Sequence, residues 1–153
     1  MSSQKNEHQL KEDVEIVRTK NLRDFVYVCP HCINPLRDCV CDAYPMKLIQ
    51  LDRNIWPIVK VLNEKWYVTD SCCEGHIDSN HKIYIGFARR YHFTQPIPKG
   101  FSGDGFVLCA DISAASVQAI QRKKRRLLNA LYDWACELET QRPEGGIVAL
   151  RDF

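Results

Sequence analysis

Apolar residues recur at helical spacing in two segments of the chain. In residues 52–65, DRNIWPIVKVLNEK, one helical face is formed by Ile55, Ile58, Val59 and Leu62. In residues 114–139 a longer stripe is formed by Val117, Ile120, Leu127, Leu131, Trp134, Ala135 and Leu138. These patterns predict two amphipathic helices. Pro57 is compatible with the first helix because it falls in the first turn, and Asp52 or Asn54 can cap its start.

Shorter apolar stretches between turn residues predict β-strands. They cover residues 24–30, 46–52, 65–71, 81–88, 106–112 and 147–153. Residues 10–17 fit either a short helix or a strand, and we expect residues 1–20 to be mobile or partly ordered. The mixture of strands and two helices predicts an α+β or α/β fold. We expect a small mixed sheet covered by two helices, forming a single domain over residues 21–153.

Composition narrows the class of protein. The 153 residues include no apolar run near the roughly 20 residues that a membrane-spanning helix needs, so we expect no membrane partner. The polar start MSSQKNEHQLKED lacks the apolar segment of a secretory signal, and we expect a cytoplasmic protein whose thiols stay reduced. Eight cysteines in such a chain favour metal binding over disulfides.

Four cysteines fall within thirteen residues: Cys29, Cys32, Cys39 and Cys41. The first pair has the spacing of a zinc knuckle, and residues i and i+2 of an extended chain point to the same side, so the second pair can reach the same ion. Asn34 and Pro35 supply a turn between the pairs. We therefore predict a structural zinc site in loop 29–41, closed by four thiolates. We expect a strong chelator to unfold at least the N-terminal third.

Other arrangements of these cysteines remain open. The thiols can stay reduced and scattered, they can form two local disulfides, or His31 can replace one cysteine as a ligand. Four thiolates and one Zn²⁺ would change the formal charge of the chain from +2 to about zero. The isoelectric point therefore says little about partners.

A second group of reactive side chains follows the predicted strand 65–71, in the sequence SCCEGH. Gly75 permits a positive φ, which lets successive backbone N–H groups converge on an anion. Arginines at the end of the next predicted strand can supply a cationic rim, either near the loop or at the opposite end of the sheet. The predicted ligand-binding residues, for a nucleotide or another phosphate-bearing ligand, are Ser71, Cys72, Cys73, Gly75, His76, Arg89 and Arg90.

Three other interpretations of loop 71–76 compete with a phosphate site. A cysteine can act as a nucleophile with His76 as its base, which requires a lowered thiol pKa and a third, orienting group. A second metal can be bound by Cys72, Cys73, His76 and His81. The loop can also be a tight turn with buried thiols, because cysteine is among the most often buried residues.

Residues 55–87, IWPIVKVLNEKWYVTDSCCEGHIDSNHKIYIGF, resemble a family of small uncharacterised proteins of Gram-positive bacteria and their phages. That pattern has a helix with an early proline, LNEKGY, a strand, SCSGH and an aromatic-rich strand. The resemblance implies a bacterial or phage setting, and the host cytoplasm if the chain is phage-encoded.

More distantly, TDSCCEGH is similar to the Ser-Ser-Cys-Ser-Gly-Arg loop of the wybutosine-synthesis methyltransferase family, which acts on tRNA. This resemblance implies S-adenosylmethionine as cofactor and a phosphate-rich substrate. Ser71, Cys72 and Gly75 match that motif. Cys73 stands where the motif has serine, Glu74 is additional, and His76 replaces arginine.

The basic run 122–126, RKKRR, encircles the second predicted helix, because consecutive helical residues advance about 100°. Lys124 interrupts the apolar stripe, so either its side chain extends along the core edge or the helix projects from the body. The run is either a solvated face or a contact for phosphates. We therefore expect a zinc-containing protein that binds a nucleotide or nucleic acid, with an RNA-modifying or cysteine-dependent enzyme and a protein-interaction module as alternatives.

Overall fold

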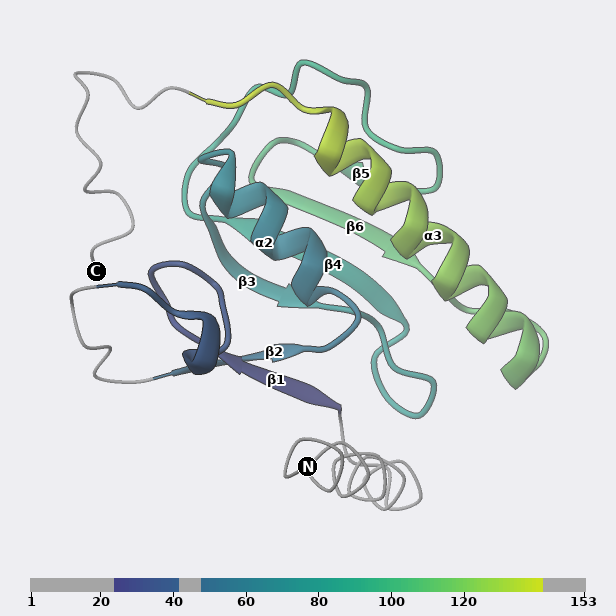
Figure 1. The fold of residues 1–153 in the computed structure, drawn as a ribbon. Coiled ribbons are helices and arrows are strands. Elements are labelled where there is room, and N and C mark those ends of the chain that lie inside the picture. Colours follow the sequence, from purple (N-terminus) through teal and green to yellow (C-terminus); the bar gives the residue numbers. More distant parts are fainter. Residues whose placement is uncertain (1–23, 42–47, 142–153) are drawn as a thin grey trace.

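The computed structural model describes residues 24–41 and 48–141 of the chain. These residues form a pair of β-sheets and two α-helices, arranged as Figure 1 shows. The first sheet pairs β1 (Phe25–Val28) with β2 (Ile49–Asp52). The second sheet has the strand order β3 (Thr69–Cys73), β4 (Lys82–Phe87), β6 (Val107–Asp111) and β5 (Ser102–Gly103). The helices are α2 (Trp56–Glu64), α3 (Val117–Glu137) and the short 3₁₀ turn η1 (Leu36–Asp38).

The α+β class predicted from the sequence is confirmed, but the strands form two sheets instead of one mixed sheet. Every pairing between the named strands is antiparallel. The physical reason lies in the connections: β3 and β4 are joined by a short loop, which returns the chain antiparallel, and no helix separates them. The predicted segments 10–17 and 147–153 lie outside the described residues.

The strands β1, β2, β4 and β6 fall inside the predicted stretches, whereas β3 is shifted toward the C-terminus and includes both adjacent cysteines. The two-residue strand β5 was missed because it lies in the Pro/Gly-rich segment 95–105, where no apolar alternation marks it. Position 103 requires glycine, because the Cβ of any other residue would lie 1.9 Å from the carbonyl oxygen of Val107.

The helix α3 forms where its apolar stripe predicts, although its first residues differ. The chain remains extended at Ser116, whose Oγ accepts a hydrogen bond from the Ala119 N–H at 3.1 Å and caps the helix. The predicted start at residue 114 was therefore three residues early. Val117 is 51% exposed and lies outside the buried face, while Leu131 and Trp134 are buried.

The helix α2 confirms the predicted apolar face, but its start is not capped as predicted. Pro57 lies in the first turn, and the N-cap position is Ile55, with no side-chain cap. The Asp52 backbone carbonyl accepts from the Ile55 N–H at 3.3 Å, so the backbone begins the turn. The Asp52 side chain is consequently available for a different contact, described below.

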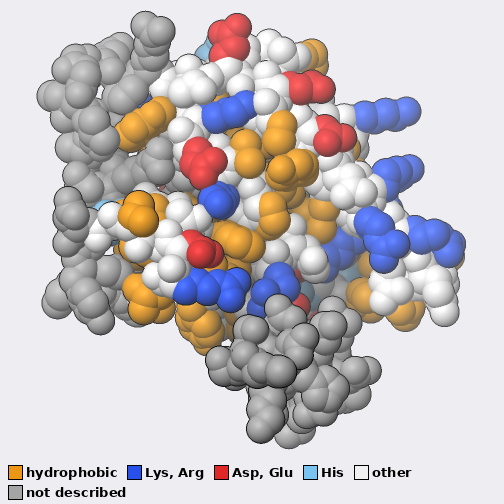
Figure 2. All heavy atoms as spheres, in the orientation of Figure 1, with side chains coloured by type: hydrophobic (Ala, Val, Ile, Leu, Met, Phe, Trp, Pro, Cys, Tyr) orange, Lys and Arg blue, Asp and Glu red, His pale blue; other side chains and the backbone are white. Residues whose placement is uncertain are grey.

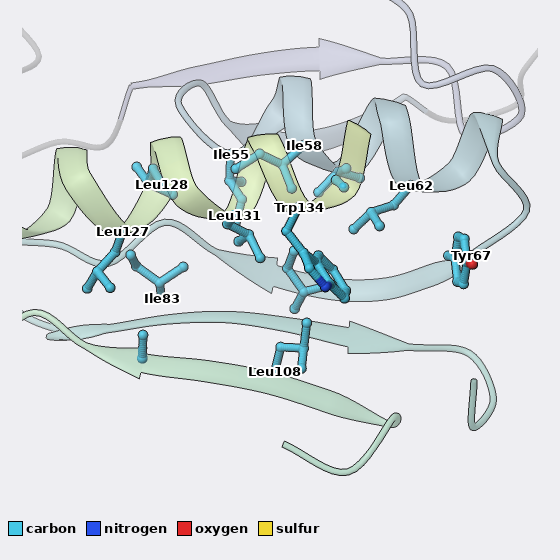
Figure 3. Close-up of a cluster of buried hydrophobic side chains, with 14 of the residues drawn as sticks. Ile55, Ile58, Leu62, Tyr67, Ile83, Leu108, Leu127, Leu128, Leu131 and Trp134 are labelled. Carbon is cyan, nitrogen blue, oxygen red and sulfur yellow. The ribbon is translucent and has the colours of Figure 1, made fainter. Parts of the chain in front are cut away.

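Both helices lie over the same face of the four-stranded sheet (Figure 1). In Figure 3 their side chains point toward the strands that carry Ile83 and Leu108, which are fully buried. Phe93 extends this core and contacts Trp134 edge-on, with ring centroids 4.9 Å apart. Of the helices among the described residues, none is long and apolar enough to cross a membrane.

Candidate functional site

The four predicted zinc ligands meet at one point beside the β1–β2 sheet. The sulfur atoms of Cys29, Cys32, Cys39 and Cys41, called the four-cysteine cluster below, lie within 4.8 Å of one another, and all four are free thiols. Cys29 follows β1, and the Ile33 N–H donates to its carbonyl oxygen at 2.9 Å, which closes the knuckle. The turn η1 then places Cys39, whose N–H donates to the Leu36 carbonyl at 3.2 Å. The donor set fits a tetrahedral metal ion.

The backbone next to the knuckle is strained at Ile33. Ile33 adopts φ of +60°, which is rare for a β-branched residue. The His31 N–H donates to the Cys29 sulfur at 3.4 Å, as backbone amides do in metal knuckles, and its imidazole is not among the cluster's ligand atoms. The four cysteines, without His31, are therefore the candidate ligands.

The thiols of the four-cysteine cluster differ in how readily they ionise. Burial opposes ionisation of Cys29, but the backbone N–H groups of Cys32 and His31 and the neighbouring thiols lower its pKa to about 7. Burial and the neighbouring thiols raise the pKa of Cys41 to about 12, and the pKa of Cys39 is also raised, although the Cys41 backbone N–H opposes that change. One thiol of the cluster ionises readily, and its negative charge then opposes ionisation of the next thiol. A cation would remove this repulsion.

The predicted loop 71–76 is divided between a strand and a turn. Ser71, Cys72 and Cys73 belong to β3, and the turn begins at Glu74. Side chains alternate along a strand, so the two cysteines face opposite sides of the sheet. Cys72 pairs with Ile85 and packs against the core, and burial followed by the Asp52 charge raises the pKa of Cys72 to about 12. Ser71 is exposed, and its hydroxyl donates to Asp70 at 3.1 Å.

Gly75 has the positive φ that its sequence context predicts, at +80°. It is buried, and a Cβ there would lie 2.9 Å from Cδ1 of Ile112. Its backbone N–H stabilises the thiolate of Cys73, so this donor points at a sulfur within the protein. Gly75 therefore has the positive φ that was predicted, but its N–H already serves a partner within the protein.

Glu74 connects three elements, although its sequence context gave no sign of this role. Its carboxylate accepts from the Asn54 side chain at 2.7 Å and from the Asn54 N–H at 3.2 Å. The same carboxylate pairs with the Lys124 ammonium at 2.6 Å, and the side chains are 4% and 18% exposed respectively. Lys124 thus extends along the core edge, the first of the two predicted alternatives, toward an acidic partner.

Asp52, Cys73 and His76 form a second cluster at the junction of the two sheets. One ligand atom of each lies within 4.8 Å of the others. Nε2 of His76 is 3.2 Å from Oδ2 of Asp52, and this oxygen also accepts from the Glu74 N–H at 3.1 Å. Asn80 donates to the Cys73 sulfur at 3.4 Å. Cys73 and His76 were predicted as site residues but Asp52 was not, because its place at the end of an apolar strand was the only signal in the sequence.

Contacts within the second cluster change the pKa values of the His76 imidazole and the Cys73 thiol. The Asp52 carboxylate, followed by the Cys73 thiol, raises the pKa of His76 to about 9, against the effect of burial. Burial opposes ionisation of Cys73, but interactions with His76, the Gly75 N–H and Asn80 lower its pKa. An imidazolium therefore lies beside a thiol whose pKa is lowered. The histidine predicted as the base of a nucleophilic cysteine is thus protonated, and Cys73 is only 4% exposed.

The remaining predicted residues lie elsewhere. His81 contacts the Ser113 hydroxyl at 3.2 Å and the Ile77 carbonyl at 2.7 Å, so the four-ligand set with His81 and Cys72 is not assembled. Arg89 and Arg90 follow β4, whose last residue pairs with the first residue of β3. They consequently lie at the opposite end of β3 from Gly75 and His76.

The basic run 122–126 borders an open hollow of about 260 Å³ at the start of α3. We call it the cationic hollow; its lining residues are Ala114, Ala119, Arg122, Lys123 and Arg126. Figure 2 shows Lys and Arg side chains gathered along this edge of the molecule. The first turn of α3 carries no acidic residue, so the positive end of the helix dipole adds to the same field.

Comparison with protein-family models, curated proteins and solved structures finds no match to the chain.

Proposed function

We propose that this protein binds zinc at the four-cysteine cluster and contacts the phosphate backbone of a nucleic acid through the cationic hollow. The observation that carries the proposal is the convergence of Arg122, Lys123 and Arg126 on one open hollow. Two alanines leave room there for a phosphate group, and a volume of about 260 Å³ is below the roughly 300–1,000 Å³ of sites that enclose a whole small molecule. Phosphates along a strand therefore suit it better than a bound nucleotide.

Charge favours the hollow over the loop 71–76 as the phosphate site. Around the loop, the nearby cations Lys124 and His76 are already paired with the carboxylates of Glu74 and Asp52, so they offer little attraction to an anion. Around the hollow, Arg122 and Arg126 are exposed on one helical face. Lys123 donates to the Ser113 carbonyl at 3.1 Å, which holds its ammonium near the helix start. The phosphate ligand predicted for the loop is therefore better placed at the hollow.

Zinc is the metal best suited to the four-cysteine cluster. Four thiolates in tetrahedral arrangement are its usual structural donor set, with Zn–S distances of about 2.3 Å. Four protein ligands leave no open position, so this ion would fold the 29–41 segment and take no part in chemistry. Elemental analysis of the purified protein tests this half of the proposal. The Cys29→Ser/Cys32→Ser variant should hold one zinc ion fewer per chain than the unmodified protein.

The nucleic-acid half is tested by the fluorescence anisotropy of a labelled duplex titrated with zinc-loaded protein from about 50 to 200 mM salt. We compare Arg122→Gln/Arg126→Gln with Arg37→Gln/Lys60→Gln, which removes the same charge away from the hollow. Each lost phosphate contact reduces the slope of log K against log salt by about 0.9, so the first variant should lose about 1–2 in slope. The second variant should bind as the unmodified protein does.

Two results would contradict the nucleic-acid proposal. One is an unmodified protein that fails to bind duplex or single-stranded oligonucleotides at about 50 mM salt. The other is an equal loss of affinity in both double variants, because that would reflect net charge instead of the hollow. Neither result would bear on zinc, so the two halves of the proposal fail independently.

A further inference from the structure

We propose that Asp52, Cys73 and His76 form a second metal site, which binds a zinc-class divalent ion between the β1–β2 sheet and the four-stranded sheet. One oxygen, one sulfur and one nitrogen lie within 4.8 Å of one another at the point where β2 ends and β3 gives way to a turn. Ligands at about 2.0–2.3 Å from a tetrahedral zinc are about 3.3–3.8 Å apart. Small side-chain rotations would therefore bring all three onto one ion.

An unsatisfied nitrogen gives independent support for a cation at this point. Nε2 of His76 is buried and has no hydrogen-bond partner among the described residues. It lies 3.2 Å from Oδ2 of Asp52, which is within ion-pair distance, without forming a hydrogen bond to it. A buried polar atom without a partner is costly, and a bound ion is one arrangement that would satisfy it. A metal ion placed between the two groups would coordinate both.

The three side chains are also held as metal ligands usually are. The Glu74 N–H donates to Asp52, and the Asn80 amide donates to Cys73. Such outer contacts orient ligands and tune their affinity for the ion. The mixture of oxygen, sulfur and nitrogen donors suits borderline zinc better than calcium or magnesium, which prefer oxygen alone.

The competing interpretation is that Cys73 is a nucleophile with His76 as its base. Cys73 is 4% exposed, and the Asn80 amide further covers its sulfur. A substrate would have to displace the turn to reach it, whereas a metal ion needs no such opening. Three protein ligands would leave one coordination position for water or an external ligand.

The first test uses the unmodified, full-length protein loaded with NMR-active cadmium in place of zinc. We expect two protein-bound cadmium resonances. One has the strong deshielding of four thiolates, and the other has the weaker deshielding of a single sulfur. Proton–cadmium correlation should connect the second resonance to the Cys73 β-protons and the His76 ring. A single bound resonance, or a second one coupled to other residues, would overturn the proposal.

The second test counts zinc by native mass spectrometry in Asp52→Asn, Cys73→Ser and His76→Gln. We expect the unmodified protein to hold two zinc ions and each variant to hold one. Cys72→Ser and His81→Gln are matched controls, because they change a neighbouring thiol and a neighbouring imidazole outside the cluster, and both should keep two ions. Two ions in His76→Gln, or one in the unmodified protein, would contradict the proposal. If a variant does not fold, the cadmium experiment decides.

Discussion

At the residue scale, Glu74 is the most consequential side chain that the sequence pattern did not single out. We expect Glu74→Ala to lower the free energy of unfolding by about 3–5 kcal/mol, because it leaves the Lys124 ammonium unpaired at the core edge. The matched control is Glu64→Ala, which breaks an exposed pair with Lys60 at 3.9 Å and should cost less than about 1 kcal/mol. Urea denaturation measures both, and equal losses would show that the buried pair contributes nothing particular.

Gly75 provides a second prediction at this scale. Its φ is +80°, and a Cβ at this position would approach Ile112 to 2.9 Å, so Gly75→Ala should destabilise the fold by about 1–3 kcal/mol. Ser79→Ala, in the exposed region of the same loop, should change stability by less than about 0.5 kcal/mol. Thermal unfolding of the two variants is the measurement. An unaffected Gly75→Ala variant would mean that the turn adopts another conformation in solution.

At the scale of elements, α3 covers the sheet through one narrow stripe, and Leu131 lies at its centre. This side chain is fully buried, so Leu131→Ala should cost about 2–5 kcal/mol through lost burial and the cavity left behind. Asn129→Ala, on the exposed face of the same helix, should change the free energy of unfolding by less than about 0.5 kcal/mol. The measurement is the denaturant midpoint of each variant, with an unchanged slope of unfolding free energy against denaturant concentration. Similar midpoints for Leu131→Ala and Asn129→Ala would contradict the assigned helix face.

The local stability of the 29–41 segment should depend on bound metal more than the stability of the four-stranded sheet does. It contributes Ile33 to the core, next to Val28 of β1, but little else that is apolar and buried. Removal of metal by a chelator should therefore speed amide hydrogen exchange in residues 28–39 before it affects β4 and β6. Mass spectrometry of exchanged peptides reads this out. Uniform acceleration would mean that the two sheets unfold together, and no change would argue against a structural metal.

At the scale of the whole molecule, stability should rise with free zinc in proportion to the number of sites. An ion that binds only the folded chain adds about 1.4 kcal/mol per site for each tenfold increase in its concentration above the dissociation constant. Two sites predict a slope of about 2.8 kcal/mol, and His76→Gln should return it to about 1.4 kcal/mol. Urea denaturation at buffered zinc concentrations gives the slope. Equal slopes in both proteins would argue for one stabilising ion.

The distribution of charge is also a property of the whole molecule. The candidate metal ligands gather near the two sheets, while the outward cations of α3 line a hollow at its first turns. One cation of the basic run, Lys124, is neutralised by Glu74, so the run divides into an inward lysine and outward side chains. A helix rotates consecutive residues by about 100°, which makes such a division unavoidable for a run of five.

The sequence by itself determined the features that depend on local spacing. The helical faces follow from periodicity, the knuckle from Cys29 and Cys32, and the positive φ of Gly75 from its lack of a side chain. These features involve residues that are close along the chain, so their geometry is nearly fixed by local backbone conformation.

Only the tertiary structure decided which distant residues meet. Asp52 and His76 come together because two sheets join there, and Glu74 meets Lys124 because α3 returns across the sheet about fifty residues later. Antiparallel pairing of β3 with β4 also decided that Arg89 lies at the end of the sheet away from the turn, which the sequence had left open. Contacts of this kind are set by strand direction and packing, which leave no local signal. The second cluster is consequently a product of the fold, whereas the four-cysteine cluster can be found in the sequence alone.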